Sequence, residues 1–193
     1  MVCADLIVLT EFKNNDSGKH IADSLYREGY IHHIRSSESV NKNGVGVFAK
    51  DLIERKSIIF FDNENTCSIL HNGMTYICTF CANDDVTSSF LNDIEKLGFQ
   101  INTVIIGDLN TGPRGSKPNR YEDLNRLVKC GYKDIWRIKH TDICWSFQFG
   151  NGKSQPDHAF SSNDIDINNS NVDFDLSPIF EGLSDHGMMV LEL

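Results

Sequence analysis

The most informative stretch of this 193-residue chain is VIIGDLNTGPRG, residues 104–115. Its first three residues are apolar and β-branched, which predicts a buried strand that stops at the following glycine. Asp108 and Asn110 come next, in a segment punctuated by Gly and Pro. Because residues two apart on an extended backbone point the same way, both side chains can reach one small object beyond the strand.

This acid–amide pair has two interpretations. A carboxylate beside a neutral amide suits a phosphate next to a hard cation or an activated water, because the acid takes the metal or the proton and the amide donates to a phosphoryl oxygen. Asp and Asn are also ordinary turn residues, so an Asx turn at Asp108 would equally account for these two residues. The stretch taken alone leaves both interpretations open.

The composition is that of an ordinary folded chain, with 40% hydrophobic and 23% charged residues, and it predicts one domain over residues 1–193. No apolar run reaches membrane-spanning length and the N-terminus lacks the basic segment of a signal peptide, so we expect a cytoplasmic protein with no membrane partner. The six Cys residues lack metal-ligand spacing and are expected to be buried thiols. The formal net charge of −9 argues against avid nonspecific binding to nucleic acid.

Hydrophobic patterning predicts short strands near residues 5–9, 30–34, 44–48, 57–61, 67–70, 76–80, 104–106, 144–149, 158–160 and 188–193. It also predicts a helix capped by Ser17, a helix capped by Asp84 or Asp85, and a helix over residues 119–129. Asn72-Gly73 indicates a tight hairpin turn, and the polar residues 161–177 indicate a surface loop. Many strands with a few helices favour an α/β sandwich, with sheets inside and helices outside.

Polar residues stand at the ends of several of these predicted strands: Glu11, Asp108, Asn110, Asp157 and the Asp185-His186 pair. Polar side chains at the tips of apolar strands can gather at one rim of a β core. Several carboxylates at such a rim repel one another unless a cation lies among them. The pattern therefore predicts a catalytic cluster built around a cation.

Three ordered motifs carry a family resemblance: IGDLN at 106–110, QPDHAFSS at 155–162 and LSDHGMMV at 183–190. Together with the strand that ends at Glu11, they resemble the signatures of the endonuclease/exonuclease/phosphatase (DNase I-like) family. The stretch KDIWR at 133–137, followed by Trp145, resembles the family's connecting segment. The resemblance runs from near residue 5 to the C-terminus. It implies a four-layer α/β (α+β) sandwich, with two central, mostly antiparallel β-sheets flanked by helices.

The resemblance implies hydrolysis of a phosphodiester by an activated water. On this hypothesis Asp108 orients or deprotonates the water. Asn110 and His186 donate hydrogen bonds to the scissile phosphate as negative charge builds on it. Asp157 fixes the tautomer and the orientation of His186.

The resemblance also implies a Mg²⁺ or Mn²⁺ cofactor with Glu11 and Asp185 as ligands. Arg114, Lys117 and Arg120 form a small basic loop, which is either solvated or a site of contact with substrate phosphates. A nucleic acid is the favoured substrate. The alternatives are a phosphoinositide or another small phosphoester, or a binding module of the same fold that has lost turnover.

Two features depart from the family pattern. Phe80 or Cys81 stands where the family carries a Tyr or His, so no residue is assigned to the leaving group. The family's usual first strand, with its supporting Asn, is missing ahead of the Glu11 strand. The apolar run at residues 6–9 has the pattern of a strand paired on both edges. We therefore expect a truncated chain with an exposed sheet edge, or a homodimer in which a second copy covers that edge.

Overall fold

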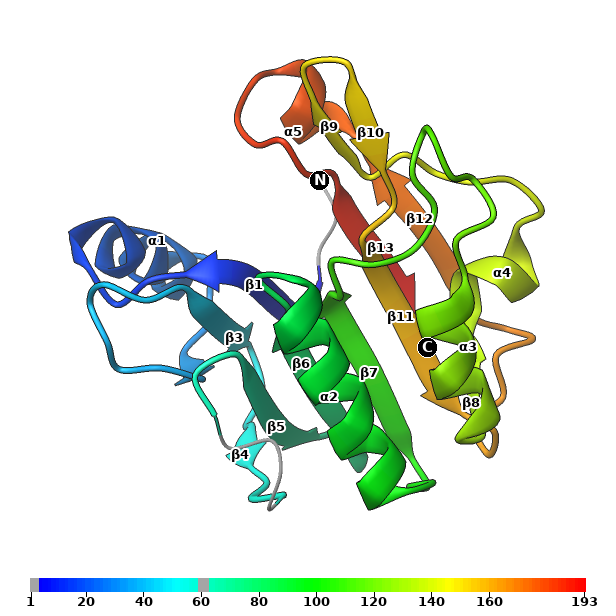
Figure 1. The fold of residues 1–193 in the computed structure, drawn as a ribbon. Helices are drawn as coiled ribbons and strands as arrows, with labels where there is room; N and C mark the ends of the chain where they lie inside the picture. Colours follow the sequence, from blue (N-terminus) through cyan, green and yellow to red (C-terminus); the bar gives the residue numbers. More distant parts are fainter. Residues whose placement is uncertain (1–3, 59–62) are drawn as a thin grey trace. The chain divides into compact units, whose positions relative to one another are not determined.

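The computed structural model describes residues 4–58 and 63–193 (Figure 1). The chain divides into two compact units, an N-terminal unit Met1–Phe80 and a C-terminal unit Cys81–Leu193. Both units mix helices with strands, and the strand pairs within each of them are antiparallel. Within the described residues, no helix is long and apolar enough to cross a membrane.

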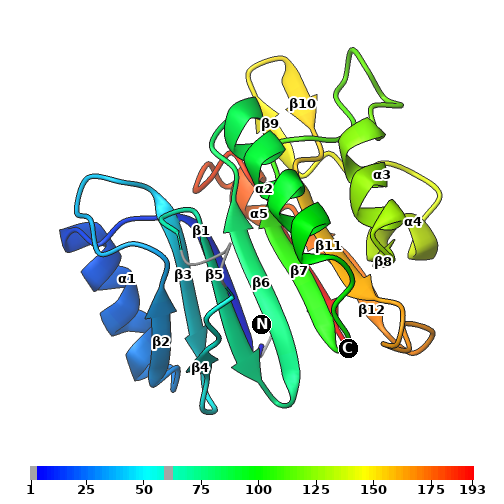
Figure 2. The ribbon, with the colours of Figure 1, turned by 60° about the horizontal axis from the view of Figure 1, so that its bottom comes forward.

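The N-terminal unit places one helix beside a small antiparallel sheet of order β1-β3-β2 (Figure 2). Ala22 and Leu25 of the helix pack against a core of Phe12, Tyr30 and Phe48. A second set of strands pairs in the order β4-β5-β6. The elements of this unit are β1 (Leu6–Phe12), α1 (Asp16–Arg27), β2 (His32–Arg35), β3 (Gly44–Ala49), β4 (Glu54–Arg55), β5 (Thr66–His71) and β6 (Met74–Phe80).

The C-terminal unit contains the strand order β7-β11-β8, a β9–β10 hairpin and a β12–β13 pair. Its core joins α4 and β11 to β12 through Ile135, Trp136, Ala159, Val172 and Phe174. The elements are α2 (Asp84–Leu97), β7 (Thr103–Asp108), α3 (Glu122–Lys129), β8 (Tyr132–Asp134), α4 (Ile135–Lys139), β9 (Phe147–Phe149), β10 (Gly152–Ser154), β11 (Asp157–Ser162), β12 (Asn171–Asp175), α5 (Ser177–Phe180) and β13 (Met188–Glu192).

Several local predictions are confirmed. The 104–106 run lies in β7, where Val104 and Ile105 are fully buried. Asn72 and Gly73 have φ values of 49° and 78° between β5 and β6, the left-handed pair that a tight hairpin requires. Cys67, Cys78 and Cys81 are buried, as predicted, whereas Cys130 and Cys144 are only partly buried. Cys3 lies outside the described residues.

The predicted helix caps are wrong by one or two residues. Asn15 caps α1 by accepting from the Gly18 amide, and Asn83 caps α2 by accepting from the Val86 amide. In each helix the Asn takes the extended backbone that leaves its side-chain oxygen over the first turn. The third helix begins at Glu122 rather than at residue 119, because residues 117–120 form a turn.

Three strand predictions also need correction. The strand predicted at 144–149 begins only at Phe147, and residues 144–146 are not in a strand. The surface loop predicted at 161–177 contains β12, whose Val172 and Phe174 are buried in alternation. Of the strand predicted at 57–61, residues 59–61 lie outside the described residues, and residues 57 and 58 are not in a strand.

Candidate active site

The register of β7 against β11 brings two of the predicted carboxylates together. β7 ends at Asp108 and β11 begins at Asp157, and these residues are direct partners across the antiparallel pair. Side chains of directly opposed residues lie close to each other. Two carboxylates at the same edge of one sheet therefore form the base of the site.

Asp157 is held between a histidine and a serine. Its Oδ2 atom lies 3.0 Å from Nδ1 of His186 and accepts a 2.8 Å hydrogen bond from the Ser146 hydroxyl. Ser146 is fully buried, so this hydroxyl is kept from water. The predicted Asp157–His186 pairing is thus present. Ser146 was not predicted, because its spacing from Asp157 has no pattern that marks a hydrogen bond.

Strand β9 fixes the segment that carries His186. The Gln148 amide donates to the backbone oxygen of Asp185 at 2.9 Å, and the Gly187 amide donates to that of Ser146 at 2.7 Å. The Phe147 ring meets the His186 ring edge-on, with centroids 5.0 Å apart. The imidazole is therefore restrained by a ring on one side and by a carboxylate at Nδ1.

The surrounding carboxylates favour a charged imidazole. Burial acts to lower the pKa of His186, but the hydrogen bond and charge of Asp157 outweigh it, together with the charges of Asp108 and Asp185. The net effect raises the pKa of His186 from 6.5 to about 9. In the absence of a metal ion, His186 at neutral pH is accordingly a cation among three acids.

The Asx turn considered from the sequence is present after β7. Asn110 has a left-handed φ of 48°, and its amide donates to Oδ1 of Asp108 at 2.7 Å. The Leu109 amide donates to the Pro156 backbone oxygen at 2.9 Å. The backbone is therefore not extended through Asn110, and the two side chains are related by this turn rather than by a strand alternation.

The basic loop follows this turn. Arg114 contacts it directly, with Nη2 3.4 Å from the Asn110 backbone oxygen. Arg114 and Lys117 close the loop by two backbone hydrogen bonds of 3.1 and 2.8 Å. The structure thus brings one of the three predicted cations, Arg114, to the Asp108–Asn110 turn.

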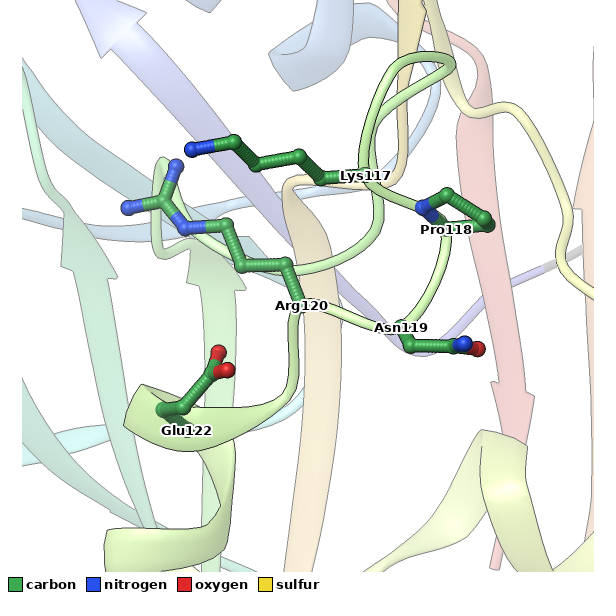
Figure 3. A pocket seen from close by; sticks show the side chains of 5 residues that line it. All are labelled: Lys117, Pro118, Asn119, Arg120 and Glu122. Atoms are coloured by element: carbon green, nitrogen blue, oxygen red, sulfur yellow. The ribbon is translucent and has the colours of Figure 1, made fainter.

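The other two cations line a pocket of about 510 Å³ with Pro118, Asn119 and Glu122. In Figure 3 the side chains of Lys117 and Arg120 extend to the same side, and Asn119 points away from them. Arg120 also lies 3.8 Å from carboxylate oxygens of Asp84 and of Asp123. Part of its charge is therefore already balanced.

No family model and no curated protein matches the sequence. Solved structures do resemble it. The 3′-5′ exonuclease NExo from Neisseria meningitidis has a TM-score of 0.75 at 17% identity, covering 98% of this chain and 89% of that chain. The 3′ phosphatase NExo from Neisseria, bound to a product DNA hairpin, has a TM-score of 0.77 at 17% identity. This match covers 98% of this chain and 88% of the phosphatase chain. An AP endonuclease from Archaeoglobus fulgidus has a TM-score of 0.70 at 18% identity. This match covers 98% of this chain and 88% of the endonuclease chain.

The chain has the DNase I-like fold. The fold class predicted from the three motifs is therefore confirmed over nearly the whole chain. At 17 to 18% identity the likeness concerns the fold and not the activity.

Glu11, the predicted metal ligand of the N-terminal unit of this DNase I-like chain, has an unusual backbone. The pairing of β1 with β3 shifts between Leu9 and Phe12, and Glu11 inside this irregularity has a φ of 56°. Its Oε2 accepts a 3.2 Å hydrogen bond from Asn43. A positive φ in a residue other than glycine is uncommon, and such strain is concentrated at functional sites. Its role as a metal ligand stays a prediction.

The donor set suits a hard cation. Among residues 4–58 and 63–193, no group of three or more His, Cys, Asp or Glu side chains is arranged as a ready metal cage. Mg²⁺ does not need one, because it keeps several waters and is usually bound through one or two carboxylates. The exposed Asp185, beside a concentration of acidic charge, fits such a ligand.

Proposed function

We propose that the protein is a divalent-metal-dependent phosphodiesterase that hydrolyses nucleic acid. The observation that carries the proposal is the Asp157–His186 pair, set beside Asp108 where β7 and β11 meet. This arrangement lies in a DNase I-like fold, and the proteins of that fold compared above are an exonuclease, a 3′ phosphatase bound to DNA and an AP endonuclease.

The geometry suggests a role for each side chain. The Nδ1 atom of His186 is engaged by Asp157, which leaves Nε2–H to donate to a phosphoryl oxygen as charge builds on it. Asp108 takes the proton of the attacking water as the water oxygen bonds to phosphorus and the bond from phosphorus to the leaving oxygen breaks. Asn110 supplies a neutral donor to the same phosphate. The leaving oxygen has no assigned proton donor.

The cofactor proposed is Mg²⁺ or Mn²⁺, held by Asp185 and, by the sequence prediction, by Glu11. When bound, the ion supplies a Lewis acid at a phosphoryl oxygen. The chain's own contribution is to orient His186 through Asp157 and Ser146, which hold the imidazole in one rotation with Nδ1 directed at Asp157.

The deciding experiment is hydrolysis of bis(p-nitrophenyl) phosphate by the purified chain with Mg²⁺ or Mn²⁺. We expect turnover that excess EDTA removes and added metal restores. Plasmid DNA, single-stranded DNA, RNA and a phosphoinositide then serve as parallel substrates, and cleavage of the nucleic acids is the expected outcome. Full activity in excess chelator contradicts the metal requirement. Turnover of the phosphoinositide alone contradicts the nucleic-acid substrate.

A further prediction concerns the basic loop. If Lys117 and Arg120 contact the nucleic-acid backbone, then changing both to Gln should raise KM and flatten its dependence on salt concentration. The matched control changes Lys129 and Lys139 to Gln, which removes the same charge from the same unit outside the loop. If KM depends on salt concentration equally in the two double variants, the loop does not contact the nucleic acid and is simply solvated.

A further inference from the structure

His158 is a buried histidine that the proposed chemistry does not use. It follows Asp157 in β11, so the two side chains leave opposite faces of the strand. Its side chain is almost fully enclosed, with 2% of the residue exposed. The Nε2 atom lies 3.0 Å from the backbone oxygen of Thr111, which is one residue beyond Asn110.

The ring lies tightly against the turn that carries Asn110. Gly112 has a φ of +121°, and a Cβ atom added there would lie 2.8 Å from His158 Nε2 and 2.7 Å from the backbone oxygen of Gln155. Only a residue without a side chain fits between these groups. The His158 ring can therefore lie this close to the turn only because residue 112 is a glycine.

The turn is held on both sides of Asn110. Before it, the Leu109 amide donates to Pro156. After it, the Thr111 backbone oxygen accepts from His158 and the Thr111 hydroxyl donates to Asp123 at 2.8 Å. These contacts fix the backbone to which the Asn110 side chain is attached.

A histidine is a costly choice for packing alone. Across the described parts of the chain, Nδ1 of His158 is buried without a hydrogen-bond partner. A buried polar atom left unpaired lowers stability, and an apolar side chain of similar size would avoid that cost. The hydrogen bond from Nε2 is what the histidine supplies and an apolar residue does not.

We propose that His158 is a positioning residue, whose Nε2–H bond to the Thr111 carbonyl sets the place at which Asn110 presents its amide to substrate. The link to catalysis rests on the function proposed above. The structural part, that His158 orders residues 109–113, stands independently of it.

The test compares His158→Leu, which loses the donor, with His158→Gln, which keeps a side-chain N–H. We expect His158→Leu to lower kcat by about 10- to 100-fold with little change in KM, since small displacements of a positioned group have effects of this size. His158→Gln should recover most of the loss. The matched control is His140→Leu, because His140 Nε2 also lies 2.8 Å from a backbone oxygen, that of Val172, but outside the turn.

Two further measurements separate positioning from folding. In an Asn110→Ala background, His158→Leu should lower kcat no further, because both changes act through one amide. Independent losses would contradict the proposal. Exchange of the amide hydrogens of residues 109–112 should quicken in His158→Leu and not in His140→Leu, and this readout needs no activity. Unchanged exchange would overturn the inference, whereas an inactive wild-type chain with quickened exchange in the variant would overturn only the proposed function.

Discussion

Replacing His186 with Ala is expected to lower turnover by about a hundredfold or more, the usual effect of losing a group that stabilises developing charge. Asp157→Asn should also lower turnover, because Asp157 acts by holding Nδ1 of His186 at 3.0 Å. Since the two residues act as a unit, the double variant should lose far less than the product of the single losses. Single-turnover kinetics on one phosphodiester substrate measures all three.

The matched control for this cycle is Asp134→Asn. Asp134 is a buried carboxylate of the same unit, where it caps α4 and lies 3.7 Å from Arg137. Its replacement should lower the melting temperature and leave turnover of the folded protein near wild type. Independent, multiplying losses for Asp157 and His186 would show that their contact has no part in turnover.

The same pair has a signature that does not depend on substrate. In the metal-free protein His186 should titrate near pH 9, above its ordinary value of 6.5. A raised pKa means that the pair stabilises the fold fully below pH 6.5 and that this contribution is lost as the pH rises through about 9. Proton NMR of the imidazole checks the pKa, which Asp157→Asn should lower. A wild-type His186 that titrates at 6.5 contradicts the ion pair.

Asp108→Asn is expected to lower turnover by about a hundredfold or more, because it removes the proposed proton acceptor of the attacking water. The fold should survive this change. Asp108 Oδ1 accepts from the Asn110 amide at 2.7 Å, and the amide oxygen of Asn can accept the same bond. Turnover and melting temperature measured on one preparation separate the two effects.

Asp164→Asn is the control for Asp108→Asn. Asp164 also accepts a backbone amide, that of Asn102 at 2.8 Å, just before β7 begins rather than after it ends. The two substitutions are chemically identical, so only the one at the candidate site should reduce turnover. An equal effect of both, or an active Asp108→Asn protein, would remove Asp108 from the proposed mechanism.

Much of the fold could be predicted from local sequence patterns. An apolar β-branched run requires burial on both faces, and it became β7. Asn72-Gly73 tolerates the two positive φ values of a tight hairpin, so these two residues were enough to predict the turn. Three ordered motifs then sufficed to predict the DNase I-like fold class. For the strand and the hairpin turn, the deciding pattern lies within a few neighbouring residues.

Local patterns were least informative where several residues offer the same interaction. Asn15 and Ser17 are both good helix caps, and only the backbone conformation at the helix start selects Asn15. Similarly, Val172 and Phe174 lie in a polar, Asn- and Asp-rich segment that resembles a loop, and their burial depends on packing against α4. The surrounding structure overrode a weak local preference in both segments.

Sequence patterns alone predicted which side chains form the candidate site, because Asp108, Asn110, Asp157 and His186 are polar residues at strand ends. The contacts that hold them in place are visible only in the folded chain. The bonds from Ser146 and His186 to Asp157, and from His158 to Thr111, span 11, 29 and 47 residues of chain. Such bonds depend on the register of β7 against β11 and on how distant segments approach that pair. Those are properties of the folded chain, which the periodicity of any one segment does not encode.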